Sequence, residues 1–393
     1  MVAVAVGNVD VAHMAWAAAR DVATAVPAMG APVKVAVDSA HGLALAKDVT
    51  ATVASPPFMC AAMDGYAVRG LGPWRVVGKV LAGAAPLPHK LMPGEGAEIG
   101  TGAIVPDGTD AVIPYEQCQV EHDIVTAEPP TRRHIRHAGE DFPVGEVVAS
   151  AGQRVTAAVA GVVAQSGVDV VWVTPQPSVW LIVTGDEVIT SGVPVAGQVR
   201  EAHTAVVAAL TGRAGGVFAG RTVIGDDPQL LRQELEATSA KVVVVSGSSS
   251  AGRADHLREV LTGMGGRWLI DGVACRPGHP QGLGQTVDGR WVVSLPGNPF
   301  AGMVAGLTLL EPLVSSLAGR DPAKALRLPV SGHVGPYEHG VRLVPVTLDD
   351  RGGAVVIAGS RPGSLRAVAR ADAVAVIEPG WTDGAVAELL LVP

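Results

Sequence analysis

The sequence has few aromatic residues, few cysteines and no long uninterrupted hydrophobic run. Aromatic residues make up 4% of the 393 residues although 48% are hydrophobic, so the cores must consist mainly of valine, alanine and leucine. The cysteines Cys60, Cys118 and Cys275 are far apart and form no CxxC pair, which is typical of reduced thiols and argues against a metal-thiolate site. No apolar run reaches the roughly 20 residues that span a bilayer, and no basic leader precedes the apolar N-terminus. We therefore expect a globular, cytoplasmic protein without a transmembrane helix.

Charged residues of one sign are not clustered. The chain has 29 lysine and arginine residues against 37 aspartate and glutamate residues, which gives a net charge of -8. Proteins that bind nucleic acid or anionic membranes usually carry a basic patch, so we expect neither partner. The sequence also lacks a GxxxxGK[ST] loop and an HExxH motif, which argues against a P-loop nucleotide site and a zinc-protease site. Anionic ligands would have to be bound by local sites.

The stretch KVVVVSGSSSAGRAD, residues 241–255, contains the most informative loop of the chain. Four consecutive valines predict a strand that is buried on both faces of a parallel sheet. The loop behind this strand offers backbone amides and hydroxyl groups from Gly247, Ser248, Ser249, Ser250 and Gly252. Such a loop can bind phosphate at the start of the following helix, with Asp255 beside it for a bridging metal ion. A flexible serine-glycine turn with a solvated acid explains the same residues equally well.

Strands and helices alternate around this stretch. Polar residues follow each predicted strand, namely Asp186 and Glu187, Asp226, the RPGHP motif at 276–280 and the PGNPF motif at 296–300. Parallel strands gather their carboxyl ends at one edge of a sheet, where α/β proteins bind ligands. We expect helices over 203–213, 229–237 and 253–261 and a long apolar helix that ends at Leu317. Both motifs are expected to lead from a strand into a helix.

The flanking parts of the chain have other patterns. Residues 14–26 are rich in alanine and predict a helix, and residues 37–49 predict a second one. Between residues 74 and 118, short apolar runs separated by glycine and proline predict a small β-rich domain. Residues 322–393 repeat this pattern with almost no helical period, which predicts a terminal β domain.

Several acidic residues stand at or near glycine or proline bends: Asp64, Asp141, Asp186, Glu187, Asp226 and Asp255. Mg²⁺ keeps several waters and takes one or two protein oxygens together with substrate phosphate, so carboxylates at bends are suitable ligands. Aspartate is also a preferred turn residue. For any single acid, a turn is the simpler explanation.

Seven motifs occur in an order and spacing that resemble one family. They are PPFMCAAMDGYAV, TGAIVPDGTDAV, IRHAGEDFPVG, VTGDEV, the serine-glycine loop with Asp255, RPGHP and LPGNP. On these motifs the chain resembles the molybdopterin molybdenumtransferases, the molybdenum cofactor insertases related to the E domain of gephyrin. The resemblance implies a multidomain α/β plus β fold in an elongated homodimer. Its four parts would be a composite N-terminal domain (1–54 and 139–174), a β-rich inserted domain (55–138), a central α/β molybdopterin-binding domain (175–321) and a C-terminal β-barrel (322–393).

The resemblance further implies a Mg²⁺-dependent transferase that inserts molybdate into adenylylated molybdopterin and releases AMP. The motif acids Asp186, Glu187, Asp226 and Asp255 would hold Mg²⁺ and act in catalysis, together with Asp64 across the dimer. The substrate-binding residues that it implies are Thr101, Arg136, Asp141, Gly247, Ser248, Ser249, Ser250, Gly252, Arg276, His279, Pro296, Gly297, Asn298, Pro299, Arg342 and Ser364. Molybdopterin adenylyltransferase and molybdoenzymes would be the partners.

The RPGHP motif departs from the family pattern KPGKP, because Arg276 and His279 replace two lysines associated with oxyanion binding. An unperturbed imidazole has a pKa near ~6.5 and is mostly neutral at neutral pH. Molybdate affinity is therefore expected to rise as the pH falls through the titration of His279, unless this side chain points away and only caps the Pro280 turn. The alternative function is a divergent paralogue that binds pterin or a partner without turnover. An oxyanion other than molybdate, such as tungstate, is a further alternative.

Overall fold

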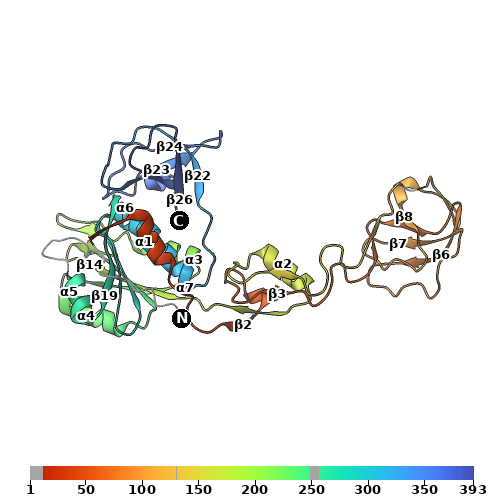
Figure 1. Ribbon diagram of the computed structural model, residues 1–393, viewed down its shortest axis with the longest axis horizontal. Coiled ribbons are helices and arrows are strands. Elements are labelled where there is room, and N and C mark those ends of the chain that lie inside the picture. Colours follow the sequence, from red (N-terminus) through yellow and green to blue (C-terminus); the bar gives the residue numbers. More distant parts are fainter. Residues whose placement is uncertain (1–11, 130, 248–255) are drawn as a thin grey trace.

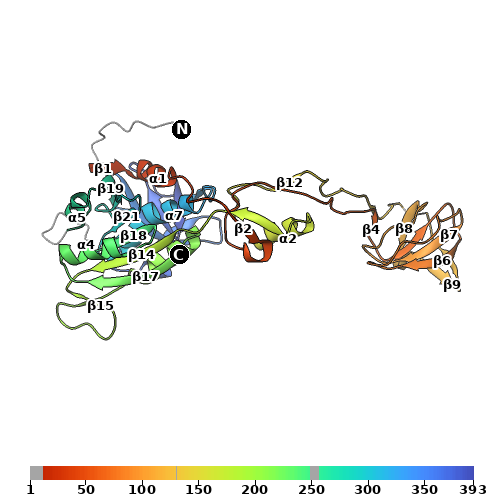
Figure 2. The same ribbon diagram turned by 90° about the horizontal axis from the view of Figure 1, so that it is seen from below.

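The computed structural model describes residues 12–129, 131–247 and 256–393, and the chain is elongated (Figure 1). An α/β unit and a C-terminal barrel lie together at one end, and a small unit around α2 (Ala157–Gln165) lies in the middle. A β-rich unit, called the distal unit below, lies at the other end. Figure 2 shows the same separation from a perpendicular direction. Side chains of the α/β unit and of the distal unit are therefore far apart within one chain.

A largely parallel sheet organises the α/β unit. Its strands follow the order β17-β14-β18-β21-β20-β19. They span Val217–Ile224, Ser178–Thr184, Val242–Ser246, Trp291–Leu295, Gly282–Gln285 and Arg267–Arg276. Only β20 runs against its neighbours in this order. The buried valine strand that the sequence predicts is confirmed, because all four valines of β18 are 0% exposed.

Helices cover both faces of this sheet. They are α1 (Trp16–Thr24), α3 (Thr204–Ala214), α4 (Pro228–Ala237), α5 (Leu257–Gly263), α6 (Pro299–Ala305) and α7 (Glu311–Leu317), with a π-helical turn at Gly306–Leu310. Val242 and Val244 pack in the core of α1, α3, α6 and α7, whereas Val243 and Val245 pack in the core of α4 and α5. This alternation is the period of two that a strand imposes. The helices predicted over 203–213 and 229–237 are confirmed within one residue.

The long apolar helix predicted to end at Leu317 is also confirmed. Within the described residues, Pro299–Leu317 is the one helix long and apolar enough to cross a membrane. Its apolar window is 83% buried inside the protein. The apolar surface of this helix therefore packs in the protein core, against α1, α3 and the sheet.

The N-terminal segment joins the α/β unit. β1 (Ala12–Ala15) pairs in parallel with β19, and Trp16, Ala19 and Ala23 of α1 belong to the same core as the sheet. Trp16 Nε1 donates a hydrogen bond to Thr308 Oγ1 at 3.1 Å. The helix predicted over 14–26 is confirmed at 16–24, and residues 12–26 add to the α/β core. The domain limits given above stay a prediction.

The middle unit has its own small core and two antiparallel strand pairs. The pairs are β2 (Val33–Ala36) with β13 (Val170–Val173), and β3 (Val49–Thr50) with β12 (Val147–Ala149). Thr156 caps α2 by accepting a hydrogen bond from Val159 N, as a threonine before a helix commonly does.

The helix predicted over residues 37–49 is wrong. Only Val37–Ser39 forms a short 3₁₀ turn, and the following residues bend back to the α2 side of the unit. Gly42 adopts a left-handed φ of +82°, which a helix interior does not allow. Leu45, which is 1% exposed, is buried from a non-helical segment. The apolar spacing reflects burial of an irregular chain and not a helical face.

The distal unit confirms the predicted β-rich segment. Its six-stranded sheet has the order β8-β5-β7-β6-β10-β9. These strands span Ala111–Pro114, Gly65–Val68, Glu95–Ile99, Trp74–Val80, Ile124–Thr126 and Gln119–Glu121, with a 3₁₀ turn at Tyr115–Gln117. The pair β4 (Cys60–Ala61) and β11 (Ile135–Arg136) lies where this unit meets the middle unit.

The C-terminal β-barrel is confirmed as five strands. They are β22 (Leu326–Ser331), β23 (Val341–Leu348), β24 (Ala354–Val356), β25 (Ala373–Ile377) and β26 (Val386–Leu391), with a 3₁₀ turn at Val368–Arg370. The pairing of β23 with β25 closes the barrel. β23 also pairs in parallel with the end of β19. This pairing fixes the barrel at the carboxyl edge of the α/β sheet.

Candidate active site

Five strands of the α/β unit end at one edge of its sheet. β14, β17, β18, β19 and β21 run in one direction, so the segments that follow them meet at that edge. The RPGHP motif differs from its prediction, because it leads into the antiparallel strand β20 and not into a helix. Gly278 has a φ of +101°, and Val273 N donates to His279 O at 3.0 Å. These features close a hairpin between β19 and β20.

Two glycines let the acidic tips of β14 and β17 approach each other. Gly225 precedes Asp226, and a Cβ on this glycine would lie 2.6 Å from Asp186 Oδ1. A Cβ on Gly185 would lie 2.7 Å from Glu187 Oε2. Asp226 N donates to Asp186 Oδ1 at 3.2 Å. The structure therefore brings Asp186, Glu187 and Asp226 together.

These three carboxylates, the acidic cluster, repel one another. Burial and then the charges of Glu187 and Asp186 raise the pKa of Asp226 above its usual value. Within residues 12–129, 131–247 and 256–393, no three His, Cys, Asp or Glu side chains form a group that could hold a metal ion. Asp255 lies outside the described residues. The acidic cluster thus has an excess of negative charge but not a complete ligand set of its own.

The loop after β18 starts at Gly247, which has a left-handed φ of +97°. A Cβ here would lie 2.4 Å from Thr184 O and 2.7 Å from Thr184 Oγ1. A Cβ on Gly297 would lie 3.4 Å from Gly247 Cα. The tips of β14, β18 and β21 therefore meet at Gly247. Ser248, Ser249, Ser250 and Gly252 lie outside the described residues.

Replacement of Gly247 by alanine is expected to lower the free energy of unfolding by about 2–4 kcal/mol, because the methyl group meets backbone atoms at a positive φ. Gly192→Ala is the matched control. Gly192 also has a positive φ, +82°, but nothing lies within 4 Å of a Cβ there. Its replacement is expected to cost only the backbone term of about 1–2 kcal/mol. Denaturant unfolding measures both variants, and equal losses would contradict the close contact at Gly247.

The PGNPF motif is held by a histidine that the sequence analysis did not identify. His203, just before α3, is 6% exposed, and its Nε2 lies 3.1 Å from Gly297 O. Burial lowers the pKa of His203 below its usual value, so the ring is neutral at pH 7 and can donate from Nε2. A lone histidine before a helix carries no motif. Only the preceding Glu201, whose carboxylate accepts from the N–H of Thr204, marks the helix start in the sequence.

A pocket of about 410 Å³ lies between the α/β unit and the barrel. We call it the arginine pocket, because Arg276, Arg342 and Arg361 are among its lining residues. The other predicted site residues in its lining are His279, Pro296 and Asn298. Gly297 and Pro299 are their chain neighbours. Ser364 is not in the lining, and its Oγ accepts a hydrogen bond from Arg366 N at 3.3 Å.

His279 is held by the hairpin on which it lies. Its Nδ1 is 2.9 Å from Val273 O. A neutral ring that donates from Nδ1 to this carbonyl has no proton on Nε2. This contact supports a role for His279 in holding the turn before Pro280.

Asp64 and Thr101 lie together in the distal unit. Thr101 N donates to Asp64 Oδ1 at 2.7 Å, and Tyr115 N lies 3.3 Å from Asp64 O. Figure 1 shows the middle unit between the distal unit and the α/β unit. Within one chain these two residues do not reach the acidic cluster.

Arg136 and Asp141 pair with each other near the strand pair of β4 and β11. Arg136 Nη2 lies 2.5 Å from Asp141 Oδ1, and Ser55 Oγ donates to Asp141 Oδ2 at 3.2 Å. The hydrogen bond from Arg136 lowers the pKa of Asp141. The pair therefore lies at the start of the distal unit and not beside the acidic cluster.

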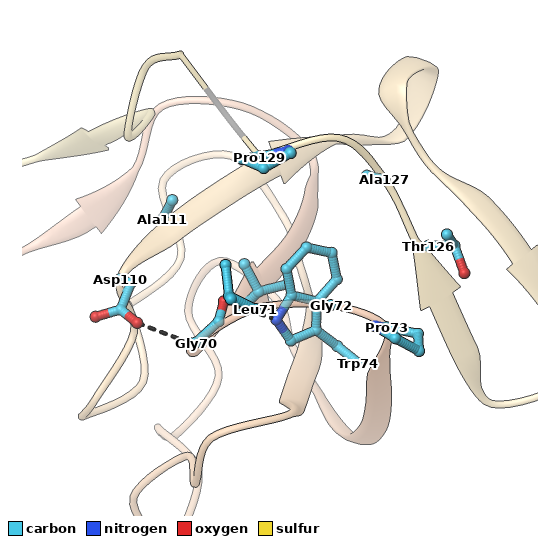
Figure 3. A pocket seen from close by; sticks show the side chains of 11 residues that line it. Gly70, Leu71, Gly72, Pro73, Trp74, Asp110, Ala111, Thr126, Ala127 and Pro129 are labelled. Atoms are coloured by element: carbon cyan, nitrogen blue, oxygen red, sulfur yellow. Dashed lines mark hydrogen bonds between the residues drawn. The ribbon is translucent and has the colours of Figure 1, made fainter.

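A second pocket, of about 390 Å³, lies in the distal unit (Figure 3). Leu71, Pro73 and Trp74 give it an apolar wall, and Asp110 accepts a hydrogen bond from Gly70 N at 2.7 Å. It lies at the carboxyl end of β5, whereas Asp64 precedes the other end of this strand. None of the site residues predicted from the sequence lines it.

Comparisons with known proteins cover all of these units. A family model for the MoeA N-terminal region (domain I and II) matches residues 14–167, and a model for a probable molybdopterin binding domain matches residues 180–316. Molybdopterin molybdenumtransferase 2 of Mycobacterium tuberculosis is 33% identical over 317 residues, which cover 75% of this chain and 78% of that protein. The molybdopterin molybdenumtransferase of Haemophilus influenzae is 32% identical over 292 residues, 71% of each chain.

Solved structures of molybdopterin biosynthesis proteins are also similar to this chain. A molybdopterin biosynthesis moeA protein from Pyrococcus horikoshii matches with a TM-score of 0.77 at 26% sequence identity. The match covers 97% of this chain and 99% of that one. The arrangement of an α/β unit, a barrel, a middle unit and a distal unit is thus shared along the whole chain.

Proposed function

Because the chain belongs to the molybdopterin molybdenumtransferase family and has a role in molybdenum cofactor biosynthesis, we propose that it inserts molybdate into adenylylated molybdopterin and releases AMP. The observation that carries this proposal is that a negatively charged group of residues and a positively charged one lie at the same edge of the sheet. The acidic cluster follows β14 and β17, and the arginine pocket follows β19 and β21. A reaction that joins a pyrophosphate ester with an oxyanion needs both kinds of site.

In this proposal the acidic cluster holds Mg²⁺. The raised pKa of Asp226 supports it, because neighbouring carboxylates that disfavour joint ionisation are stabilised by a divalent cation. Asp186, Glu187 and Asp226 would hold the ion together with Asp255, since the described side chains alone form no metal-binding group. When bound, Mg²⁺ neutralises charge on pyrophosphate oxygens and favours departure of AMP.

Mg²⁺ is expected to stabilise the protein against thermal unfolding. At ten times its dissociation constant, the ion should add about 1.4 kcal/mol, which corresponds to roughly 3–5 °C in Tm for a domain of about 150 residues. Asp226→Asn should reduce this shift to less than about 1 °C. Asp227→Asn is the matched control, because Asp227 caps α4 and asparagine caps equally well. An unchanged shift in Asp226→Asn would contradict the metal site.

The remaining site residues position the substrate. The loop that begins at Gly247 would bind the pterin phosphate through amides and hydroxyls, and His203 fixes the PGNPF bend beside it. We propose a homodimer in which Asp64 and Thr101 of one copy face the acidic cluster of the other. We also propose that the protein works in the cytoplasm, receives its substrate from molybdopterin adenylyltransferase and supplies molybdoenzymes.

A non-catalytic pterin-binding or scaffolding paralogue is the second candidate. It is favoured by His279, which replaces a permanent cation and whose Nδ1 is held by Val273 O. Complementation separates the two functions. Expression in a strain that lacks its own insertase should restore molybdoenzyme activity, and restoration only with excess molybdate would indicate weak oxyanion binding. Absence of restoration at both molybdate levels, with folded protein present, would favour the second candidate.

A further inference from the structure

A tight turn of the barrel, residues 361–364, is hydrogen-bonded to the start of α6. Ser364 N donates to Arg361 O at 3.0 Å, which closes the turn. Phe300 N and Ala301 N lie 3.0 and 3.3 Å from Pro362 O. The first N–H groups of α6 therefore donate to the carbonyl of this turn. Because of it, the turn is held at a defined place relative to the α/β unit.

Arg361 comes from this turn and lines the arginine pocket with two other arginines. Arg276 of β19 and Arg342 of β23 are Cα partners in the parallel pairing of these strands. Like charges directly opposite each other on neighbouring strands are destabilising. The lining thus brings together three positive charges from three different segments, and a bound anion would reduce the repulsion between them.

The contacts of Arg276 and Arg342 are with neutral groups. The guanidinium carbon of Arg276 lies 4.9 Å from the centre of the Tyr337 ring, and Arg342 Nη1 donates to Gly335 O at 3.1 Å. In the described parts of the chain, none of the three arginines forms an ion pair with a carboxylate, unlike Arg213, Arg221 and Arg290. These contacts orient Arg276 and Arg342 without neutralising their charges.

We propose that Arg361 binds the oxyanion substrate as the third fixed cation of the arginine pocket, and that Arg361, rather than His279, sets the affinity for a tetrahedral dianion at neutral pH. The identity of the dianion as molybdate rests on the proposed function. A guanidinium is always charged and offers a fork of donors to two oxygens. His279 already uses Nδ1 in its contact with Val273 O at 2.9 Å, and an imidazole, unlike a guanidinium, has no permanent charge.

Calorimetric titration of the full-length protein with molybdate at pH 7.5 tests this proposal. Arg361→Gln should weaken binding about tenfold or more, since one charge-assisted contact is lost. Arg361→Lys should lose less, because it keeps the charge, and it also serves as a second variant if the glutamine form is unstable. Arg366→Gln is the matched control from the same segment, outside the pocket lining. Arg366→Gln and His279→Gln should each stay within about twofold of wild type.

Two results would overturn the role of Arg361: wild-type affinity in both Arg361 variants, or a larger loss in His279→Gln than in Arg361→Gln. A failure of the proposed function gives a different result. Sulfate has the same charge and shape as molybdate, so it is titrated in parallel. If sulfate binds in an Arg361-dependent way and molybdate does not, Arg361 remains an anion-binding residue while the molybdenumtransferase function is contradicted.

Discussion

Asp226→Asn is expected to slow AMP release from adenylylated molybdopterin by about 100-fold or more, because removal of a single group that stabilises transition-state charge commonly has this effect. Burial, and then the charges of the neighbouring Glu187 and Asp186, raise the pKa of this carboxylate. Asparagine keeps the size and the backbone contacts but removes the charge that would attract Mg²⁺. Binding of molybdopterin itself should change by less than about twofold. Single-turnover assays with direct binding measurements separate the two effects.

Asp227→Asn is the control for this experiment. It makes the same substitution one position along the chain, at a residue that caps α4 through hydrogen bonds to Gln229 N and Leu230 N. Its turnover should match wild type. Unchanged turnover in Asp226→Asn would remove this residue from the catalytic site, and an equal loss in both variants would indicate a disturbed loop.

Two inactive variants are expected to restore activity when they are mixed. Asp64→Ala changes the distal unit and Asp226→Asn changes the α/β unit, and Figure 1 shows these two units at opposite ends of the chain. If each active site combines the distal unit of one copy with the acidic cluster of the other, a hybrid dimer has one intact site. In a random mixture half of the dimers are hybrids, so about a quarter of the wild-type activity should return.

Subunit exchange must be allowed before the mixture is assayed, for example by joint refolding or by co-expression with two different tags. Each variant mixed only with itself is the control and should stay inactive. A monomer in light scattering, or tagged hybrids without activity, would contradict the shared site.

The parts of the fold that followed from the sequence depend on local signals. Four consecutive valines predicted the strand β18, and all four are buried. The helix expected over 37–49 failed because its apolar spacing comes from an irregular segment with a left-handed Gly42. The strand β1 was missed, since it is defined by its parallel pairing with β19, a segment more than 250 residues away.

The candidate site was predictable only where residues stand at strand ends. Asp186, Glu187 and Asp226 follow β14 and β17 directly, so the direction of the strands was enough to bring them together. Arg361 and His203 carry no motif of their own. Their positions depend on tertiary contacts. The turn that carries Arg361 is held by the hydrogen bonds of Pro362 O to the start of α6. His203 is held by its contact with Gly297 O.

The most direct test of the proposed function is reconstitution with purified components. The protein is incubated with adenylylated molybdopterin, Mg²⁺ and molybdate, and both AMP release and activation of an apo-molybdoenzyme are measured. We expect one AMP per cofactor formed, with activation that requires molybdate and is lost in Asp226→Asn. Neither AMP release nor activation, under conditions in which a curated relative such as the Haemophilus influenzae enzyme is active, would contradict the assignment of this chain as a molybdenumtransferase.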